Sequence, residues 1–540
     1  MTSKTTLFAV VAALLVASWL LTLGMRHLVP SDEGRYAEIA REMFSSGDWV
    51  TIRYNDLKYF EKPPLHLWVT ALAYAAFGIG EWQARLCGAL SGLLGVAMTM
   101  LAMRRWYGNR VALMAGAALI AMPTWNFASH FNSLDITVAG VLACVLMSLL
   151  LAQHPDASPT ERRNWMWVCW FSMALALLTK GLIGIALPGL AGVVYLVFSQ
   201  QWSLLRRLHL RSGLIVLLVV AAPWFVLIAD RNPEFLQFFF IHEHWTRFTS
   251  TEHHRSGPFW YFVPQLIAGA LPWIGLVPAM SRAVSTGPAQ GFRPLVLFAC
   301  WTVSIFVFFS VSGSKLPGYI VPIFPAIAGL AAVALDQLGP VAMRRQLLGI
   351  IVMAVIGLAV AAGFALIAPS PSFALMAPAV CTSLVVLVAG GCAALRFERR
   401  GRLWSVVTIS IATYVGVSIA LAGYSPIARI RSNVDLAQPV QRVLKPDMPI
   451  YAVRLLDHTL PFYLGRTMIP VEMGDELDFG IRQEPDKWIP TVDDFLAKWA
   501  HGPQALAVMR PAVFDTLSGQ GVAMTVVARS NDRVVVANFK

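Results

Sequence analysis

Long uninterrupted apolar segments constrain this chain more than any other feature. Windows of about 17–24 residues recur up to residue 424, and each is long enough to cross a bilayer as one helix. Backbone groups find no water in hydrocarbon, so such segments must satisfy their hydrogen bonds as helices. We expect about thirteen spans, at 6–25, 85–103, 110–127, 134–152, 164–180, 181–199, 212–230, 259–281, 294–312, 318–339, 346–368, 372–395 and 402–424.

Composition agrees with a polytopic α-helical membrane protein. The chain is 57% hydrophobic and only 13% charged, about half the charge of a soluble domain. The first span follows Lys4 and lacks a small-residue cleavage site, so we expect it to be retained and not removed as a signal peptide. All six cysteines lie in or beside apolar segments, which excludes a disulfide framework and a paired-cysteine metal site.

The segment Leu65–Gly78 decides the topology. It is apolar but short for a span, and it follows Pro63-Pro64. The basic loops at 103–110, 161–165, 205–211, 343–346 and 396–402 all face the cytoplasm, as positive loops normally do, only if this segment does not cross. We therefore expect a re-entrant or surface-lying helix, with residues 425–540 on the outer face. The net charge of +12 is then explained by topology and gives no reason to expect nucleic-acid binding.

The polar tail reads as a small α/β domain. Apolar, β-branched runs at 449–455, 467–473, 505–509, 523–529 and 533–539 predict strands, and helices fit near 433–443 and 491–501. The turn Ser530-Asn531-Asp532 predicts a hairpin of the last two runs. We thus expect two domains: 1–424 in the membrane, with a catalytic first outer loop at 26–84, and 425–540 outside it.

Two carboxylates on the expected outer face are candidate catalytic groups. Asp32 follows the first span, and Asp135 lies at the mouth of a later one, in FNSLDIT. Carboxylates beside a bilayer are costly unless paired or solvated, which makes them functional candidates. Helix capping is the alternative for both, with Ser133 as the partner of Asp135. We expect a helix from Ser31 or Asp32 to about Phe44 that is amphipathic and suited to the membrane interface.

Three cations on the same face can bind a phosphate. Lys62 precedes Pro63-Pro64, which fix the backbone that presents its ammonium. Arg53 offers a forked guanidinium, and Lys180 ends a span. An ordinary solvated loop lysine and a lysine that extends to the interface are the alternatives for Lys62 and Lys180.

Two further outer-face motifs are ambiguous. His242-Glu243-His244 has a metal-binding pattern to which Glu61 can add a carboxylate, but that ligand set is incomplete. The turn from Ser314 to Tyr319 contains Lys315 and is either a connector or part of a site. The sequence has no glycine-rich nucleotide loop in a suitable context, so a cytoplasmic nucleotide site is unsupported.

Several motifs resemble a known family. Asp32-Glu33, the run Tyr59-Phe60-Glu61-Lys62-Pro63-Pro64-Leu65 and Ala84-Arg85-Leu86 resemble the first outer loop of the GT-C membrane glycosyltransferases of the protein mannosyltransferase type. The Ser314–Tyr319 turn and the aromatic segment Phe238–His244 are most similar to the lipid A 4-amino-4-deoxy-L-arabinose transferase (ArnT) family. The expected thirteen spans and outer tail domain agree with that layout.

The resemblance implies a function and a site. It implies a bacterial inner-membrane enzyme, acting as a monomer, that transfers aminoarabinose from undecaprenyl phosphate to lipid A phosphate in the periplasm and so confers polymyxin resistance. It implies no required cofactor, and any zinc at His242, His244 and Glu61 would be structural or incidental. The implied roles are carboxylates at Asp32 and Asp135, donor-phosphate binding by Lys62, Arg53 and Lys180, and a cavity lined by Tyr59, Glu61, Lys315 and Tyr319.

Other functions stay open at this stage. A transferase of another sugar, or one with a protein acceptor, would carry the same spans and motifs. A lipid flippase would place charges near the bilayer midplane and often shows inverted repeats, whereas these charges cluster at one face without a repeat. A membrane scaffold would leave the first outer loop unexplained.

Overall fold

The chain forms two compact units. The structure, a computed structural model, describes residues 3–240, 257–286, 291–367 and 370–539. The membrane unit comprises residues 1–22 and 87–424, and the loop–tail unit comprises residues 23–86 and 425–540. The first outer loop, which we expected to belong to domain 1–424, thus packs with the tail.

The membrane unit is built from helices. Its elements are α1 (Ser3–Leu21), α4 (Glu81–Ala121), α5 (Pro123–Ser129), α6 (Leu134–Ala152), α7 (Pro159–Lys180), α8 (Ile183–Ser199), η2 (Trp202–Arg207), α9 (Leu210–Arg231), α11 (Phe262–Gly269), η4 (Ile274–Leu276), α12 (Val277–Ser285), α13 (Pro294–Val311), η5 (Pro317–Ile323), α14 (Phe324–Gln337), α15 (Pro340–Ile367), α16 (Pro371–Phe397), η6 (Glu398–Arg400) and α17 (Arg402–Gly423). The first turn of α4 lies in the loop–tail unit.

Length and hydropathy identify eight spans among the described residues, or nine if the pair formed by α11 and η4–α12, which bends by 99°, counts as one. Every one of the thirteen predicted windows nevertheless contains a helix. The helix α4 covers two windows and breaks at Gly108, whose φ of 84° is accessible to glycine at little cost. The apolar part of α1 and the 17-residue α8 are shorter than the other spans. The protein is therefore a multi-span helical protein, as predicted. Among the described residues, fewer than the thirteen predicted helices meet the length and hydropathy expected of a span.

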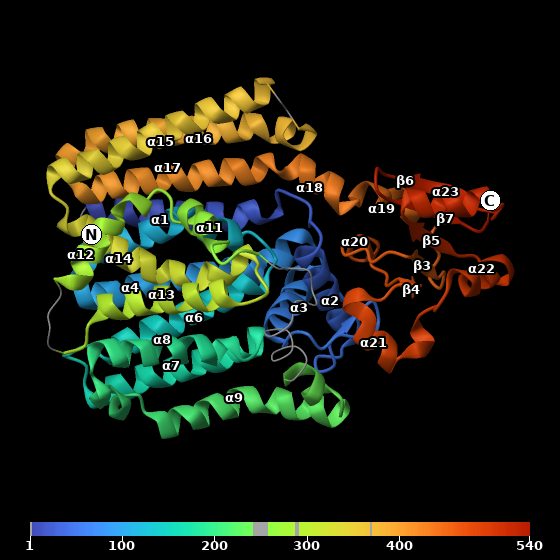
Figure 1. Cartoon of the computed structure of the whole chain (residues 1–540), viewed down its shortest axis with the longest axis horizontal. Coiled ribbons are helices and arrows are strands. Elements are labelled where there is room, and N and C mark those ends of the chain that lie inside the picture. The colour runs from blue at the N-terminus through green and yellow to red at the C-terminus, as the bar shows by residue number, and fades with distance from the viewer. Residues whose placement is uncertain (1–2, 241–256, 287–290, 368–369, 540) are drawn as a thin grey trace. The chain divides into compact units, whose positions relative to one another are not determined.

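Small residues bring neighbouring spans together. The helices α15, α16 and α17 lie side by side (Figure 1). A Cβ added to Gly390 of α16 would overlap Ala412 of α17, and one added to Gly423 of α17 would overlap Ala379 of α16. Because glycine has no side chain, the two backbones can approach closely at these positions, as is common between helices in lipid.

The tail folds around one five-stranded sheet with the order β4-β3-β5-β7-β6. Its strands are β3 (Ile450–Val453), β4 (Ile469–Val471), β5 (Leu506–Met509), β6 (Thr525–Arg529) and β7 (Val534–Ala537). β3 pairs in parallel with β4 and β5, while β7 is antiparallel to β5 and β6. Each strand lies within a predicted run, and β6 and β7 form the expected hairpin.

Alternating residues of the sheet face two separate hydrophobic cores, because successive strand side chains point to opposite faces. Ile450 packs in one core and Tyr451 in the other. The helices of the tail are α18 (Ser425–Ser432), η7 (Val434–Leu436), α19 (Ala437–Val443), α20 (Leu460–Leu464), η8 (Asp475–Leu477), α21 (Asp478–Gln483), η9 (Pro485–Lys487), α22 (Val492–His501) and α23 (Pro511–Gly519). The two predicted helices correspond to η7–α19 and α22.

The first loop adds α2 (Asp32–Ser46), the hairpin β1 (Arg53–Tyr54) and β2 (Leu57–Lys58), and α3 (Leu65–Phe77) to this unit. The expected end of α2 is confirmed, since Gly47 adopts a left-handed conformation there. At 13 residues α3 is about 20 Å long, short of the roughly 30 Å of hydrocarbon. The prediction of a short helix at Leu65–Gly78 is confirmed, and its surface or re-entrant orientation stays a prediction.

The helix α2 does not lie on a surface, contrary to the expected interfacial helix. Every residue from Glu33 to Met43 is buried, and α2 packs against α3, β1 and α20. The reason is electrostatic: its charged side chains find partners inside the unit, so its polar face can be buried as well as its apolar face.

Candidate active site

The loop–tail unit holds Asp32 beside a buried arginine. Asp32 is the first residue of α2, and its carboxylate accepts a hydrogen bond from Arg35 one turn later. The same guanidinium donates to Glu476 of η8. The side chain of Arg35 is only 4% exposed, whereas that of Asp32 is 34% exposed. Arg35 therefore orients a carboxylate that stays accessible, with help from Glu476, a tail residue that no local sequence signal connects to this loop.

Tyrosines surround this ion pair. Tyr36, Tyr54 and Tyr59 are buried, and burial raises the pKa of each well above its usual range, although the charge of Arg35 acts in the opposite direction. Their phenols therefore stay neutral at physiological pH and can donate hydrogen bonds. Tyr59 donates to the Glu61 carboxylate over 3.1 Å.

Lys62 is held by its neighbour. Its ammonium donates to the Glu61 backbone carbonyl over 2.9 Å and lies 3.4 Å from the Glu61 carboxylate. The side chain is 15% exposed, so the nitrogen is oriented but still reachable. This arrangement suits a cation that meets a phosphate as a point charge.

Arg53 contacts residues of its own hairpin and of the tail. Its guanidinium lies 2.9 Å from Glu484 and donates to the Asp56 carbonyl over 2.7 Å. Glu484 also accepts the Lys58 backbone N–H over 2.9 Å. Burial raises the pKa of Glu484, but Arg53 and its other donors outweigh burial and lower it. These contacts indicate that Arg53 fastens the β1–β2 hairpin to the tail, which competes with the predicted donor-phosphate role.

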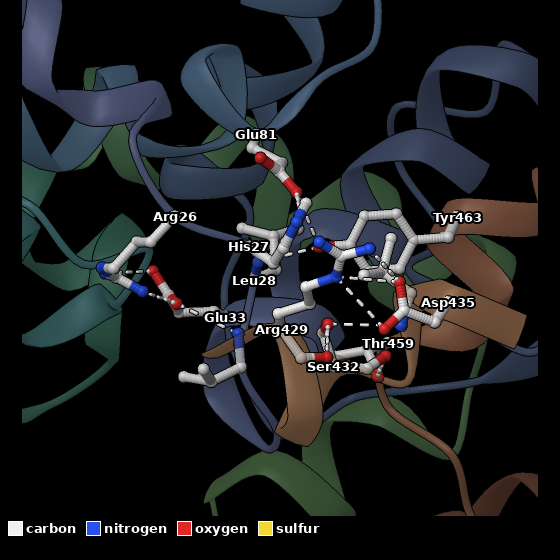
Figure 2. Close-up of polar contacts among 12 residues, drawn as sticks. Arg26, His27, Leu28, Glu33, Glu81, Arg429, Ser432, Asp435, Thr459 and Tyr463 are labelled. Atoms are coloured by element: carbon white, nitrogen blue, oxygen red, sulfur yellow. Dashed lines mark hydrogen bonds and ion pairs between the residues drawn. The ribbon is translucent and has the colours of Figure 1, made fainter. Parts of the chain in front are cut away.

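A buried ion triad lies beneath the start of α2. Glu33 is 2.5 Å from Arg26 and 2.8 Å from Arg85, and Figure 2 shows the paired Arg26 and Glu33. Burial alone would raise the pKa of Glu33, but the charges of Arg26 and Arg85 lower it to about 2. Arg85 also donates to the carbonyls of Leu23 and Arg26. The triad fixes the chain next to Asp32. Glu33 and Arg85 both belong to motifs that resemble the GT-C family, but no local pattern predicts that they pair.

A second contact ties the tail to the same loop. Glu81 accepts a 2.8 Å hydrogen bond from the Tyr463 hydroxyl and lies 2.7 Å from His27 Nδ1. The Tyr463 oxygen in turn accepts the Leu28 backbone N–H over 2.8 Å. Figure 2 shows these side chains converging.

The membrane unit contains the second candidate cluster. Asp135 at the start of α6 pairs with Lys180 at the end of α7, and Lys180 lies 4.7 Å above the ring of Tyr319 in η5. Ser133 is the capping residue of α6, accepting the Asp135 N–H over 3.1 Å, so the Asp135 carboxylate is not used as the cap. A Cβ on Gly318 would overlap that carboxylate. Three segments distant in sequence thus form one compact charged cluster.

Lys315 contacts the C-terminal end of a helix. Its ammonium donates to the carbonyls of Ser310 and Ser312, both at 2.7 Å, where α13 ends. Cations at a helix C-terminus satisfy its unpaired carbonyls. Its buried side chain thus caps α13, which competes with the predicted cavity role.

The candidate metal site receives no support from the described residues. His242 and His244 lie outside them. Within the described ranges, no group of three or more histidine, cysteine, aspartate or glutamate side chains is arranged to hold a metal. The suggested zinc at His242, His244 and Glu61 therefore has no structural basis in this part of the chain.

The candidate residues fall into two clusters, one in each unit. Asp32, Tyr59, Glu61 and Lys62 belong to the loop–tail unit, and Asp135, Lys180 and Tyr319 to the membrane unit. The joint action of Asp32 and Asp135 stays a prediction.

Comparison with known proteins identifies the family. The family described as dolichyl-phosphate-mannose-protein mannosyltransferase matches residues 61–226, and the aminoarabinose transferase C-terminal domain matches residues 436–538. The crystal structure of ArnT from Cupriavidus metallidurans bound to undecaprenyl phosphate is 50% identical, with a TM-score of 0.96 over 100% of this chain and 99% of that one.

Two curated relatives carry the name undecaprenyl phosphate-alpha-4-amino-4-deoxy-L-arabinose arabinosyl transferase. The protein of Pectobacterium atrosepticum is 30% identical over 464 residues, covering 83% of this chain and 82% of the relative. The protein of Erwinia tasmaniensis is 32% identical over 331 residues, and this match spans 61% of the chain and only 59% of the relative. The resemblance and the fold class inferred from sequence are thus confirmed, and the chain belongs to the family of undecaprenyl phosphate-α-4-amino-4-deoxy-L-arabinose arabinosyl transferases, which are membrane glycosyltransferases.

Proposed function

We propose that this protein transfers 4-amino-4-deoxy-L-arabinose from undecaprenyl phosphate to a phosphate of lipid A. The observation that carries the proposal is the likeness, along the whole chain, to a structure that contains undecaprenyl phosphate. The positive-inside bias of the basic loops supports a reaction at the periplasmic face of a bacterial inner membrane. A lipid A phosphate masked by an amino sugar attracts cationic peptides less, so polymyxin resistance is the expected phenotype. We propose that the enzyme acts as a monomer.

The reaction exchanges one phosphate for another at the sugar. A lipid A phosphate oxygen forms a bond to the anomeric carbon, the bond from that carbon to the donor phosphate breaks, and undecaprenyl phosphate leaves with the electron pair. The acceptor is already ionised at neutral pH, so the reaction needs no strong general base. Catalysis must instead orient two anions and stabilise the leaving phosphate.

The two clusters supply these functions. Lys62 and Lys180 are positioned ammonium groups that would offset the charge developing on the departing phosphate. Asp32 and Asp135 would orient the reactants or stabilise positive charge on the sugar, each held by a cation of its own unit. Tyr59 and Glu61 would position Lys62, and Tyr319 would position Lys180. Lysines in these roles make a divalent metal unnecessary for a monophosphate leaving group.

The test is expression in a bacterium that lacks its own aminoarabinose transferase, followed by mass spectrometry of lipid A. We expect the mass of one or more aminoarabinose groups with the wild-type protein, and its loss with Asp32→Asn and Lys62→Ala at unchanged membrane abundance. Asp56→Asn is the matched control: Asp56 is an exposed acid of the same loop with a positive φ that asparagine tolerates, so transfer should persist.

Three outcomes would contradict the proposal. Unmodified lipid A with wild-type protein present in the membrane would reject the function. A different added mass would indicate a sibling transferase of another sugar. Full transfer by Asp32→Asn or Lys62→Ala would reject only the role of that residue and would leave the proposed function standing.

A further inference from the structure

An apolar groove lies in the membrane unit, away from the Asp135–Lys180–Tyr319 cluster. It has a volume of about 220 Å³ and is formed by α6, α7, α8, η2, α9 and α13. On α6 it begins at Val145, ten residues after Asp135 and therefore about 15 Å along the helix. Val193, Leu205 and Leu210 of its lining are between 40% and 56% exposed, so the groove opens to the outside of the bundle.

The polar atoms of the lining are already bonded to protein. The Trp170 indole donates to the Leu208 carbonyl over 3.0 Å, and the Trp301 indole donates to the Pro322 carbonyl over 2.9 Å. The Tyr195 hydroxyl accepts the Arg293 N–H over 2.9 Å and donates to Gln201 over 3.3 Å. A water molecule needs two to four polar partners to occupy a cavity, and the indole and phenol groups of this lining are already engaged with protein. The groove therefore favours a hydrocarbon chain as its occupant.

Two glycines of α8 create the space. Gly189 and Gly192 follow Pro188 and line the groove, and a Cβ built on either would meet nothing within 4 Å. An apolar cavity of about 150 Å³ is enough to bind benzene in another protein. The groove can therefore hold several carbons of an extended chain.

Three arginines are direct sequence neighbours of residues that line the groove. Arg206 and Arg207 follow the lining residues Leu204 and Leu205 in η2, and Arg211 follows the lining residue Leu210. All three arginines are exposed. The exposed indole of Trp202 lies in the same 3-10 helix, a residue type that favours the headgroup level of a bilayer.

We propose that this groove is a binding site for an anionic phospholipid. One acyl chain lies against Gly189 and Gly192, and the headgroup phosphate binds Arg206 and Arg207. Basic pockets between spans on the cytoplasmic side are known to bind acidic headgroups, and the 205–211 loop is one of the five basic loops that we expect on that side. The site holds a lipid of the bilayer and takes no part in sugar transfer, so it does not depend on the proposed function.

The headgroup half of the proposal is tested by native mass spectrometry of the full-length protein with added phosphatidylglycerol or phosphatidylcholine. We expect retention of phosphatidylglycerol over phosphatidylcholine, and about tenfold or greater weakening in the double variant Arg206→Ala/Arg207→Ala. The matched control is Arg344→Ala/Arg345→Ala, an exposed arginine pair at the start of α15. Equal losses in both double variants would show non-specific attraction to basic loops and overturn the site.

The acyl-chain half is tested by filling the groove. Gly192→Leu should reduce phosphatidylglycerol binding to the level of the arginine variant, because a Cβ at this position has open space and the rest of the side chain would occupy the groove. Gly349→Leu is the control, since Gly349 of α15 also has open space at its Cβ but lies outside the groove. Wild-type binding by a folded Gly192→Leu protein would reject the groove as the chain site.

A measurement on the unaltered protein covers the case in which Gly192→Leu fails to fold. Phosphatidylglycerol with a photoactivatable diazirine near the end of one chain is bound and illuminated, and the adducts are located by peptide mass spectrometry. We expect adducts within 166–173 and 188–196. Adducts spread over the spans without enrichment there would overturn the proposal.

Discussion

Glu33 shows how much one residue depends on its partners. A buried carboxylate by itself would lose its hydration without compensation, yet Glu33 stays ionised because two guanidinium groups meet its oxygens. The folded-state pKa of about 2 lies below the ordinary value of 4.5. A depressed pKa means that the ionised form stabilises the fold, and this contribution is fully present above about pH 5 and is lost as the pH falls towards 2.

We predict that Glu33→Gln lowers the free energy of unfolding by about 3–5 kcal/mol, because it leaves two buried guanidinium groups facing a neutral side chain. Thermal unfolding in detergent, compared with wild type between pH 7 and pH 3, measures this. The difference should be constant from pH 7 to pH 5 and shrink below pH 4.5, as the wild type loses its advantage. A difference that does not change with pH would contradict the ionised triad.

At the scale of elements, the β1–β2 hairpin is joined to α21 and η9 through charge. Arg53 on β1 meets Glu484, which also binds the β2 backbone at Lys58. Gly480 of α21 lies so close to β2 that a Cβ would overlap the Lys58 carbonyl region. The hairpin and these short helices therefore stabilise each other, because neither is long enough to be stable in isolation.

The reversed pair Arg53→Glu/Glu484→Arg distinguishes the two roles of Arg53. We predict that Arg53→Glu alone lowers the free energy of unfolding by about 2 kcal/mol, the usual contribution of hydrogen bonds to a charged partner. Glu484→Arg should restore part of this loss, because an arginine at position 484 can pair with a glutamate at position 53 but cannot accept the Lys58 N–H. Thermal unfolding and lipid A mass spectrometry are the two measurements. If stability recovers in the double variant but aminoarabinose transfer does not, Arg53 binds the donor phosphate after all.

At the scale of the whole molecule, the tail is not independent of the first loop. The sheet has its own hydrophobic cores within 436–537. The segment 475–487 differs, since Glu476 contacts Arg35, Phe479 packs on Phe60 with ring centroids 5.4 Å apart, and Glu484 contacts Arg53. The cooperative unit therefore extends across two stretches of chain separated by the membrane spans.

We predict that an isolated fragment of residues 425–540 folds its sheet but leaves 475–487 unprotected. Amide hydrogen exchange should be slow in β3, β5 and β7 of both the fragment and the full chain. Exchange in 475–487 should be at least about a hundredfold faster in the fragment, because local opening free energy falls when buried partners are absent. Equal protection in both samples would show that the tail folds without the loop.

Local sequence patterns are sufficient to predict the helices and strands of this protein. Apolar windows predicted helices at all thirteen positions, and β-branched runs predicted all five strands of the tail, because each pattern reflects one element facing one environment. The expected end of α2 near Phe44 lies close to the observed end at Ser46 for the same local reason. The sequence also identified Asp32, Lys62, Asp135 and Lys180 as candidates, since charge beside a bilayer is costly and therefore informative.

The partner of each charged side chain depends on the three-dimensional fold. Arg53 and Lys315 had the same sequence signal as Lys62, yet one binds the Glu484 carboxylate and the other caps α13. The interfacial character expected of α2 failed because Arg26, Arg85 and Glu476 neutralise its polar face from distant parts of the chain. Periodicity reports whether a side chain is polar, but the energy of a buried charge depends on partners within a few ångströms. Folding selects those partners across hundreds of residues, which no local pattern records.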